Sequence, residues 1–501
     1  MEKISFSLLY LFTLITMNNS LAQKPAIADV ITQDSSSFFY IDFKNYPKNK
    51  ALPIGVFDSG TGGLTILNAI VKYDEHHNKT RKKGKDNIPD FRTEDFIYLA
   101  DQANMPYGNY SSVDKTDLLR EHILKDAQFM LGNKYYLNQS SICQTNKKKI
   151  KALVIACNTA TAYGKEYIEE LLKAGGSDMK VIGVIDAGAK GALETFRKEE
   201  AGTIGIFATA GTVASNGYGN SLRKLQQEMG YTGQIQFVSQ GGVGLAEAID
   251  EEVAFIDRKA KQPRNEYKGP NINVEKLNID KALFDIYHFD FKNFKMLCDA
   301  QKVDDCGQLQ INSADNYVRY HLVTLLETMR KMPTILPMKT IILGCTHYPF
   351  MTKVIHQVLS ELRNIKTEGK YRYRYLLAEK INLIDPAINT AKELYQYLNG
   401  TQLYHKNGNL TNSEFYISVP NIVNPNVKTE AQKSRLTYDY KYGRVAGEIQ
   451  EYVRMVPFSK ITIPNDVSNR LKTQIPATFK LIQAFDRINT KTYFLKNIEK
   501  L

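Results

Sequence analysis

Residues 54–60 read Ile-Gly-Val-Phe-Asp-Ser-Gly, and residues 204–211 read Ile-Gly-Ile-Phe-Ala-Thr-Ala-Gly. A second pair repeats in the same way, with Leu-Val-Ile-Ala-Cys-Asn-Thr at 153–159 and Ile-Ile-Leu-Gly-Cys-Thr-His at 341–347. Each segment is a short apolar, largely β-branched run that ends in small or polar residues. Such a run predicts a buried parallel strand that turns into a helix. The two pairs therefore predict two copies of one strand pattern, each with a cysteine at a strand end.

Eight segments of this kind alternate with helix-compatible sequence. They lie at 54–58, 96–101, 152–158, 181–187, 203–209, 234–241, 340–346 and 381–386. The segments fall into two sets of four that end in similar small or polar residues. We therefore predict an α/β fold of two similar parallel-sheet domains. The domains should face each other across a cleft, since ligands bind outside the carboxyl ends of parallel strands.

The first 22 residues have the pattern of a secretory signal, with Lys3, an apolar run and the small-x-small end Ser20-Leu21-Ala22. The apolar run is about 14 residues long, against the roughly 20 that span a bilayer, so no stable membrane span is expected in the mature chain. We expect export to the periplasm, or a cytoplasmic protein if the signal is not used. The expected organisation is a signal peptide at 1–22, a lead-in at 23–53, a first domain at 54–187, a second at 188–387 with an insertion at about 259–314, and a C-terminal extension at 388–501.

The composition of the 501 residues is that of a soluble globular protein, with 43% apolar and 24% charged residues. It excludes wholesale disorder and a protein with many membrane spans. The net charge of +12 is spread over several short runs. Runs of this length are typical of solvated loops, so no nucleic-acid partner is expected.

Five cysteines leave at least one outside any intramolecular disulfide. Cys298 and Cys306 lie close together in a polar stretch, which suits a loop-closing disulfide. Cys157 and Cys345 each follow an apolar strand at an expected helix start, where the helix dipole should lower the pKa of a thiol. Two buried, inert sulfurs or a disulfide between these two cysteines are the alternatives. A zinc site is not expected, because the ligands lack the usual paired spacing.

Two thiols on opposite walls of a cleft suit the inversion of a carbon stereocentre, in which one group removes a proton and the other delivers one to the opposite face. A single nucleophilic cysteine would indicate acyl transfer instead, but it leaves the second cysteine unexplained. Asp58 and His347 can tune the two thiols. A helix N-cap at Asp58 and a structural hydrogen bond at His347 are the simpler interpretations.

Four motifs occur in order: Asp58-Ser59-Gly60-Thr61-Gly62-Gly63-Leu64-Thr65, Pro106-Tyr107-Gly108, Ala156-Cys157-Asn158-Thr159-Ala160 and Leu343-Gly344-Cys345-Thr346-His347-Tyr348-Pro349. With these motifs the chain resembles the glutamate racemases of the aspartate/glutamate racemase superfamily over about half its length. The resemblance implies a two-base racemase that needs no cofactor. Pyridoxal phosphate is therefore not expected. It also implies the family's supply of D-glutamate for cell-wall peptidoglycan, and a homodimer as an expectation.

Carried over by this resemblance, Cys157 and Cys345 are the acid/base pair, Asp58 assists Cys157, His347 assists Cys345, and Glu247 is a further acidic residue. His347 favours glutamate as substrate, because related aspartate racemases tend to carry Glu at that position. The alternatives are a racemase of aspartate or another amino acid, and an exported amino-acid-binding protein on a racemase scaffold. The expected substrate contacts are Ser59, Pro106, Tyr107, Gly108, Asn158, Thr159, Thr209, Thr212 and Thr346.

Overall fold

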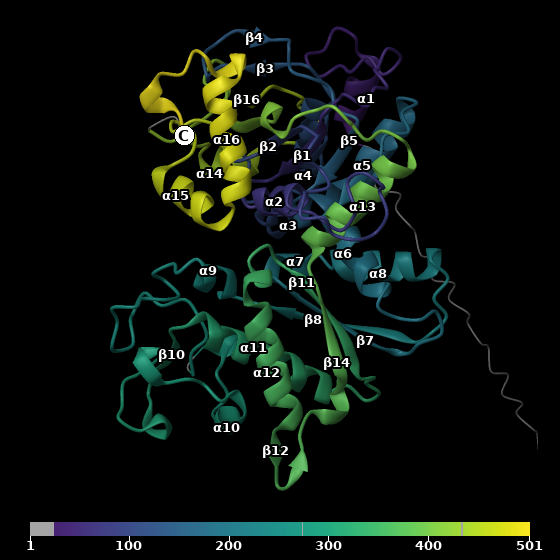
Figure 1. The fold of residues 1–501 in the computed structure, drawn as a ribbon. Helices are drawn as coiled ribbons and strands as arrows, with labels where there is room; N and C mark the ends of the chain where they lie inside the picture. Colours follow the sequence, from purple (N-terminus) through teal and green to yellow (C-terminus); the bar gives the residue numbers. More distant parts are fainter. Residues whose placement is uncertain (1–24, 273, 432–433) are drawn as a thin grey trace, which may run out of the picture.

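The computed structural model describes residues 25–272, 274–431 and 434–501, so the predicted signal segment at 1–22 lies outside the described residues. Two α/β domains lie one above the other in Figure 1. Among the described residues, no helix combines the length and apolar character needed to cross a bilayer.

The first domain is built on a six-stranded sheet of order β16-β15-β2-β1-β5-β6. Its strands run parallel except β16, which is antiparallel to β15. The strands are β1 (Ile54–Asp58), β2 (Phe96–Ala100), β5 (Ala152–Ile155), β6 (Val181–Gly183), β15 (Glu414–Pro420) and β16 (Val453–Pro457), with a small hairpin of β3 (Tyr135–Tyr136) and β4 (Cys143–Gln144) beside them.

Helices cover both faces of this sheet because alternate strand residues point to opposite sides. Ile54 and Val56 pack in one core with α2 (Leu64–Val71), α13 (Pro386–Gly400) and α16 (Pro476–Ile488). Phe57 packs in the other core with α1 (Ala26–Gln33), α4 (Thr116–Leu131) and α5 (Asn158–Ala174). The remaining helices of this domain are α3 (Gly108–Ser112), α14 (Tyr438–Gly443) and α15 (Asn465–Gln474).

The second domain has a four-stranded, all-parallel sheet of order β14-β11-β7-β8. The strands are β7 (Gly202–Ala208), β8 (Ile235–Gly241), β11 (Met338–Gly344) and β14 (Leu377–Ile384). One face packs against α6 (Val184–Leu193) and α8 (Gly217–Glu228), and the other against α11 (Ala314–Arg330) and α12 (Thr352–Asn364). Shorter elements are α7 (Ala210–Ala214), α9 (Leu245–Ile249), α10 (Phe284–Tyr287), β9 (Met296–Cys298), β10 (Leu309–Ile311), β12 (Lys366–Thr367) and β13 (Lys370–Tyr371).

The predicted α/β architecture is confirmed, and each of the eight predicted strands has its counterpart in β1, β2, β5, β6, β7, β8, β11 or β14. Several strand bounds differ from the prediction, most clearly at the end of β6. We expected a strand over 181–187, but β6 ends at Gly183 and the chain enters α6 at Val184. Gly183 takes an extended conformation as the N-cap residue, and α6 then buries its apolar residues against the second sheet and α13.

The C-terminal segment is integrated into the first domain, where the sequence offered few structural signals. β15 pairs with β2, about 300 positions away in the chain, and α16 packs in the same core as α2. Helix α15 of this segment, drawn in yellow in Figure 1, lies at the side of the first domain that faces α9 of the second.

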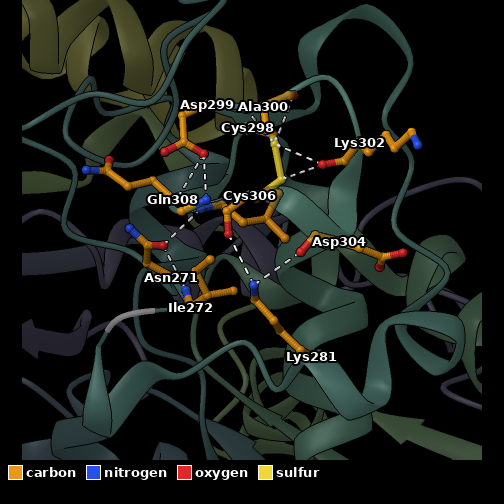
Figure 2. The surroundings of a disulfide bond; sticks show 12 residues. Asn271, Ile272, Lys281, Cys298, Asp299, Ala300, Lys302, Asp304, Cys306 and Gln308 are labelled. Atoms are coloured by element: carbon orange, nitrogen blue, oxygen red, sulfur yellow. Dashed lines mark hydrogen bonds between the residues drawn. A yellow bond between two sulfur atoms is a disulfide. The ribbon is translucent and has the colours of Figure 1, made fainter.

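The inserted region of the second domain contains the predicted disulfide between Cys298 and Cys306. Figure 2 shows its surroundings: Asp299 accepts hydrogen bonds from the backbone of Gly307 and Gln308, and Lys281 donates to the carbonyl of Cys306. The bond closes a short loop between the paired strands β9 and β10. Cys143, Cys157 and Cys345 are free thiols.

Candidate active site

The site is built at the carboxyl ends of β1, β5 and β11, as the strand pattern predicts. Asp58 is the last residue of β1 and Ser59 follows it, while Cys157 comes two residues after β5. Cys345 follows directly after β11. Each cysteine therefore stands at the same place in its own sheet, and both are almost fully buried.

The Cys157 half of the site is formed within the first domain. The Cys157 sulfur caps α5 by accepting a hydrogen bond from the Ala160 N–H at 3.4 Å, and it lies 3.6 Å from the Ser59 hydroxyl. The Asp58 carboxylate accepts a hydrogen bond from the Gly63 N–H at 2.7 Å. Gly63 is required there, because a Cβ on it would lie 2.5 Å from the Cβ of Asp58.

Burial is the largest influence on the pKa values of Cys157 and Asp58. It raises the pKa of the Cys157 thiol to about 12, and the charge of Asp58 adds to the effect. Burial also raises the pKa of the Asp58 carboxyl. Our expectation that the helix start lowers the pKa of Cys157 is therefore wrong: the Ala160 and Ser59 hydrogen bonds do lower it, but desolvation of the thiolate outweighs them.

The Cys345 half is a chain of hydrogen-bonding groups. The Cys345 sulfur lies 3.6 Å from Nδ1 of His347, and Nε2 of His347 lies 3.1 Å from Oδ2 of Asp250. Burial alone would lower the pKa of His347, but the bonds to Asp250 and Cys345 outweigh it and raise the pKa to about 10. His347 is therefore an imidazolium at neutral pH, and it can donate a hydrogen bond or a proton to the sulfur.

Asp250 is the functional residue that the sequence reasoning missed. It follows α9 directly, and Glu247, the predicted acidic residue, lies three positions earlier on that helix. Among the residues that the structure describes, the carboxylate bonded to His347 is that of Asp250. The available signal was the acidic run at 250–252, which offers three carboxylates with no means of choosing between them.

Asn158 joins the two halves. Its side-chain Nδ2 donates to the backbone carbonyl of Gly344 at 3.1 Å, and its Oδ1 accepts from the hydroxyl of Tyr218 at 3.4 Å. Asn158 follows Cys157 in the chain and Gly344 precedes Cys345. The hydrogen bond therefore brings the two cysteine segments together across the domain boundary.

A cleft of about 590 Å³ opens at this junction. Its wall includes Cys345 and Thr346 from the second domain, and Ala156 and Asn158, which flank Cys157, from the first. The cleft exceeds what a single amino acid fills. Cys157 is 6% exposed and Cys345 is 7% exposed, so both cysteine side chains are almost fully buried beside the cleft.

The other predicted contact residues have varied surroundings. The Tyr107 hydroxyl is turned into a buried acidic pair, 2.5 Å from Asp101 and 2.6 Å from Asp126, so only its backbone is left for a substrate. A phenol has one proton to donate, so one carboxyl must carry its own, and burial raises the pKa of Asp126 well above its ordinary value.

The threonines and the Pro106 segment lie at element ends. Thr209 caps α7 and donates to the Thr212 hydroxyl at 2.9 Å, and the Thr346 hydroxyl lies 3.3 Å from Nδ1 of His347. Pro106 lies between β2 and α3, Gly108 is the first residue of α3, and Thr159 is in the first turn of α5. Within the described ranges, one group has spacing that suits a metal, Cys298 with Asp299 and Cys306, and its two sulfurs are already joined in the disulfide.

Several known proteins are similar to the chain in sequence. No family model matches. A glutamate racemase from Latilactobacillus sakei is 32% identical over 242 residues, which is 48% of this chain and 68% of that protein. One from Geobacter metallireducens is 24% identical over 370 residues, 73% of this chain and 87% of the relative. A match to one from a Sulfurihydrogenibium species, 32% identical, spans about half of that relative, 52%.

The solved structure of a glutamate racemase isoform from Bacillus anthracis is 22% identical, with a TM-score of 0.40, covering 73% of this chain and 88% of that one. The fold, with a cysteine at the same strand end in both domains, and the sequence relatives define the class of the protein as an amino-acid racemase, an isomerase. The chain belongs to the glutamate racemase family.

Proposed function

We propose that the protein interconverts L- and D-glutamate with Cys157 and Cys345 as the two bases. A thiolate on one side takes the α-proton, the electron pair stays on the α-carbon, and the thiol on the other side delivers its own proton to the opposite face. One C–H bond breaks and one forms, so no redox partner is required. The observation that carries the proposal is the matching position of the two cysteines at strand ends that Asn158 holds together.

The neighbours of the two sulfurs support different starting states. The raised pKa of Cys157 favours a neutral thiol, which is the form that donates a proton. The imidazolium of His347 is placed to donate to a thiolate at Cys345, which is the form that accepts one. Turnover of one enantiomer reverses these protonation states, and the reverse reaction restores them.

Substrate binding rests in this proposal on backbone and hydroxyl groups around the cleft. Ser59, Thr346 and the backbone of Pro106 to Gly108 supply contacts for the carboxylates and the ammonium group. Because both cysteines are almost fully buried, the two domains must move to admit the substrate to both sulfurs. The names of the sequence relatives support glutamate as substrate.

We propose export from the signal-like residues 1–22, with a role in supplying or recovering cell-wall D-glutamate. The Cys298–Cys306 disulfide supports an oxidising compartment, where structural disulfides persist. Fractionation of cells that express the full chain tests this: the cleaved protein should appear in the periplasmic fraction, and an uncleaved cytoplasmic product would contradict it.

The decisive experiment follows the circular dichroism of L-glutamate and, separately, of D-glutamate with purified protein, with and without reductant. The signal should decay to zero from both sides. Aspartate and other amino acids serve as the substrate panel, and faster decay with one of them would replace glutamate as the substrate. No decay with any of them under reducing conditions would contradict racemase activity.

A further inference from the structure

A helix of the C-terminal segment contacts Asp250, which is hydrogen-bonded to His347 in the other domain. From α15, Nη1 of Arg470 lies 3.1 Å from Oδ2 of Asp250, and Nε2 of Gln474 donates to Oδ1 of the same carboxylate at 2.9 Å. The two residues are four positions apart, so they lie on one face of the helix. In Figure 1, α15 faces α9 across the domain boundary.

The Asp250 carboxylate is fully engaged by these contacts. Oδ1 is held by Gln474, while Oδ2 is shared between Arg470 and His347. The carboxylate is 9% exposed, whereas the Arg470 side chain is 40% exposed. A buried carboxylate with hydrogen bonds on both oxygens has its orientation fixed. Asp250 thereby presents one lone pair to His347.

The helix that supplies these groups is anchored in the first domain. Leu471, next to Arg470, and Ile475, next to Gln474, are buried in the core that contains α2 and β1. Asp250 and His347 belong to the second domain. The contact therefore crosses the boundary between the two domains at the site itself, and Gln474 and Ile475 also line the cleft.

We propose that Arg470 and Gln474 are positioning residues for the Cys345 half of the site. They hold the Asp250 carboxylate against Nε2 of His347, so that the imidazolium keeps its orientation toward the Cys345 sulfur. Because they come from the first domain, this orientation exists only while the two domains are in contact. The inference deepens the proposed racemase function and rests on it.

The charged groups around Asp250 allow a charge effect of Arg470 on the pKa of His347 to be distinguished from a positioning effect. His347 and Arg470 face it directly, and Glu252, which is close to Glu247, adds negative charge beside it. Burial alone would raise the pKa of Asp250, but the bonds from His347 and Gln474 and the charge of Arg470 lower it. If Arg470 acted by charge alone, its removal would make His347 easier to protonate. Loss of positioning has the opposite sign, because His347 loses its hydrogen-bond acceptor.

The test uses Arg470→Ala, Gln474→Ala and the double variant in the full mature chain. Lys472→Ala is the matched control, since Lys472 is an exposed cation on the same helix. NMR titration of the labelled His347 ring needs no substrate. The pKa of His347 should fall toward 6.5 in Gln474→Ala and further in the double variant, and stay as in wild type in Lys472→Ala. In racemisation assays kcat should fall about tenfold in the double variant, with a smaller change in KM.

A pKa of His347 that rises in Arg470→Ala, or that is unchanged in the double variant, would overturn the proposal. Arg470→Lys supplies the rescue: it should keep part of the wild-type kcat, because an ammonium still reaches a carboxylate. If wild type fails to racemise any substrate while the titration behaves as expected, the proposed function fails and the positioning does not. Circular dichroism of the folded variants excludes loss of structure as the cause.

Discussion

The Cys157 and Cys345 halves of the site start from the same strand pattern and end in opposite electrostatic surroundings. Around Cys157, the groups come from one domain, and burial raises the pKa of both the thiol and the Asp58 carboxyl. Around Cys345, His347, Asp250 and Arg470 form a chain of charges that runs from the second domain to the first. The repeated fold places the two sulfurs, whereas their neighbours give each sulfur different electrostatic surroundings.

The largest expected effect comes from removing either sulfur. Cys157→Ser and Cys345→Ser should each lower racemisation in both directions by about 10³-fold or more, because one face of the α-carbon loses its proton carrier and inversion needs both. The circular dichroism assay measures this with both enantiomers. Cys143→Ser is the control, as Cys143 is a free thiol in β4, away from both halves. Full turnover in either active-site variant would contradict the two-base mechanism.

His347→Asn removes the imidazolium beside Cys345 and leaves the Cys157 half unchanged. The amide keeps a hydrogen-bonding group but cannot carry a proton, so kcat should fall by about 10²-fold. The decline in wild-type activity above pH 10, where the imidazolium is lost, should disappear from the pH profile of the variant. A variant with the wild-type profile would show that His347 has no part in proton transfer.

Asp58→Asn tests the neutral half. Removing the carboxylate should lower the pKa of Cys157 below about 12, since its charge is the second cause of the raised value. The Cys157 thiol should then react faster with iodoacetamide at a given pH, as measured by mass spectrometry of its peptide. Racemisation should fall by about tenfold. An unchanged alkylation rate would show that burial alone sets the pKa of this thiol.

Asp250→Asn measures how much the His347–Asp250 pair contributes to the free energy of unfolding. The raised pKa of His347 contributes stability that is full below about pH 6.5 and is lost as the pH rises through 10. The lowered pKa of Asp250 contributes above about pH 3.9 and is lost as the pH falls through its folded value. The difference in unfolding free energy between wild type and variant should therefore peak between about pH 4 and 6.5. A difference independent of pH in urea titrations would refute the ion pair.

The smallest expected effect on activity lies outside both halves. Replacing Cys298 and Cys306 together by Ala should cost about 2.5 kcal/mol of stability, from the entropy of an eight-residue loop in the unfolded chain. Racemisation should stay at the wild-type rate, because the disulfide is in the inserted region. Thermal unfolding and the dichroism assay measure the two quantities, and loss of activity in the folded variant would place the insertion in the site.

The sequence was most informative where contacts are local. The segments at 152–158 and 203–209 predicted strands. The polar ends of such segments gave Asp58, Cys157, Cys345 and His347 as candidate site residues. Pairings over long separations had no local signal: β15 lies beside β2, and Arg470 meets Asp250 across 220 positions. The raised pKa of Cys157 was equally unreadable, because the helix start is visible in the sequence and the depth of burial is not.

The central claim is that the two sulfurs act on opposite faces of the same carbon. The most direct test incubates Cys157→Ser and Cys345→Ser with L-glutamate and D-glutamate separately in D₂O, and follows the α-proton by NMR. Each variant should exchange the α-proton of one enantiomer without inverting it, and the two variants should exchange opposite enantiomers. Exchange of the same enantiomer by both variants, or of both enantiomers by one variant, would contradict the account.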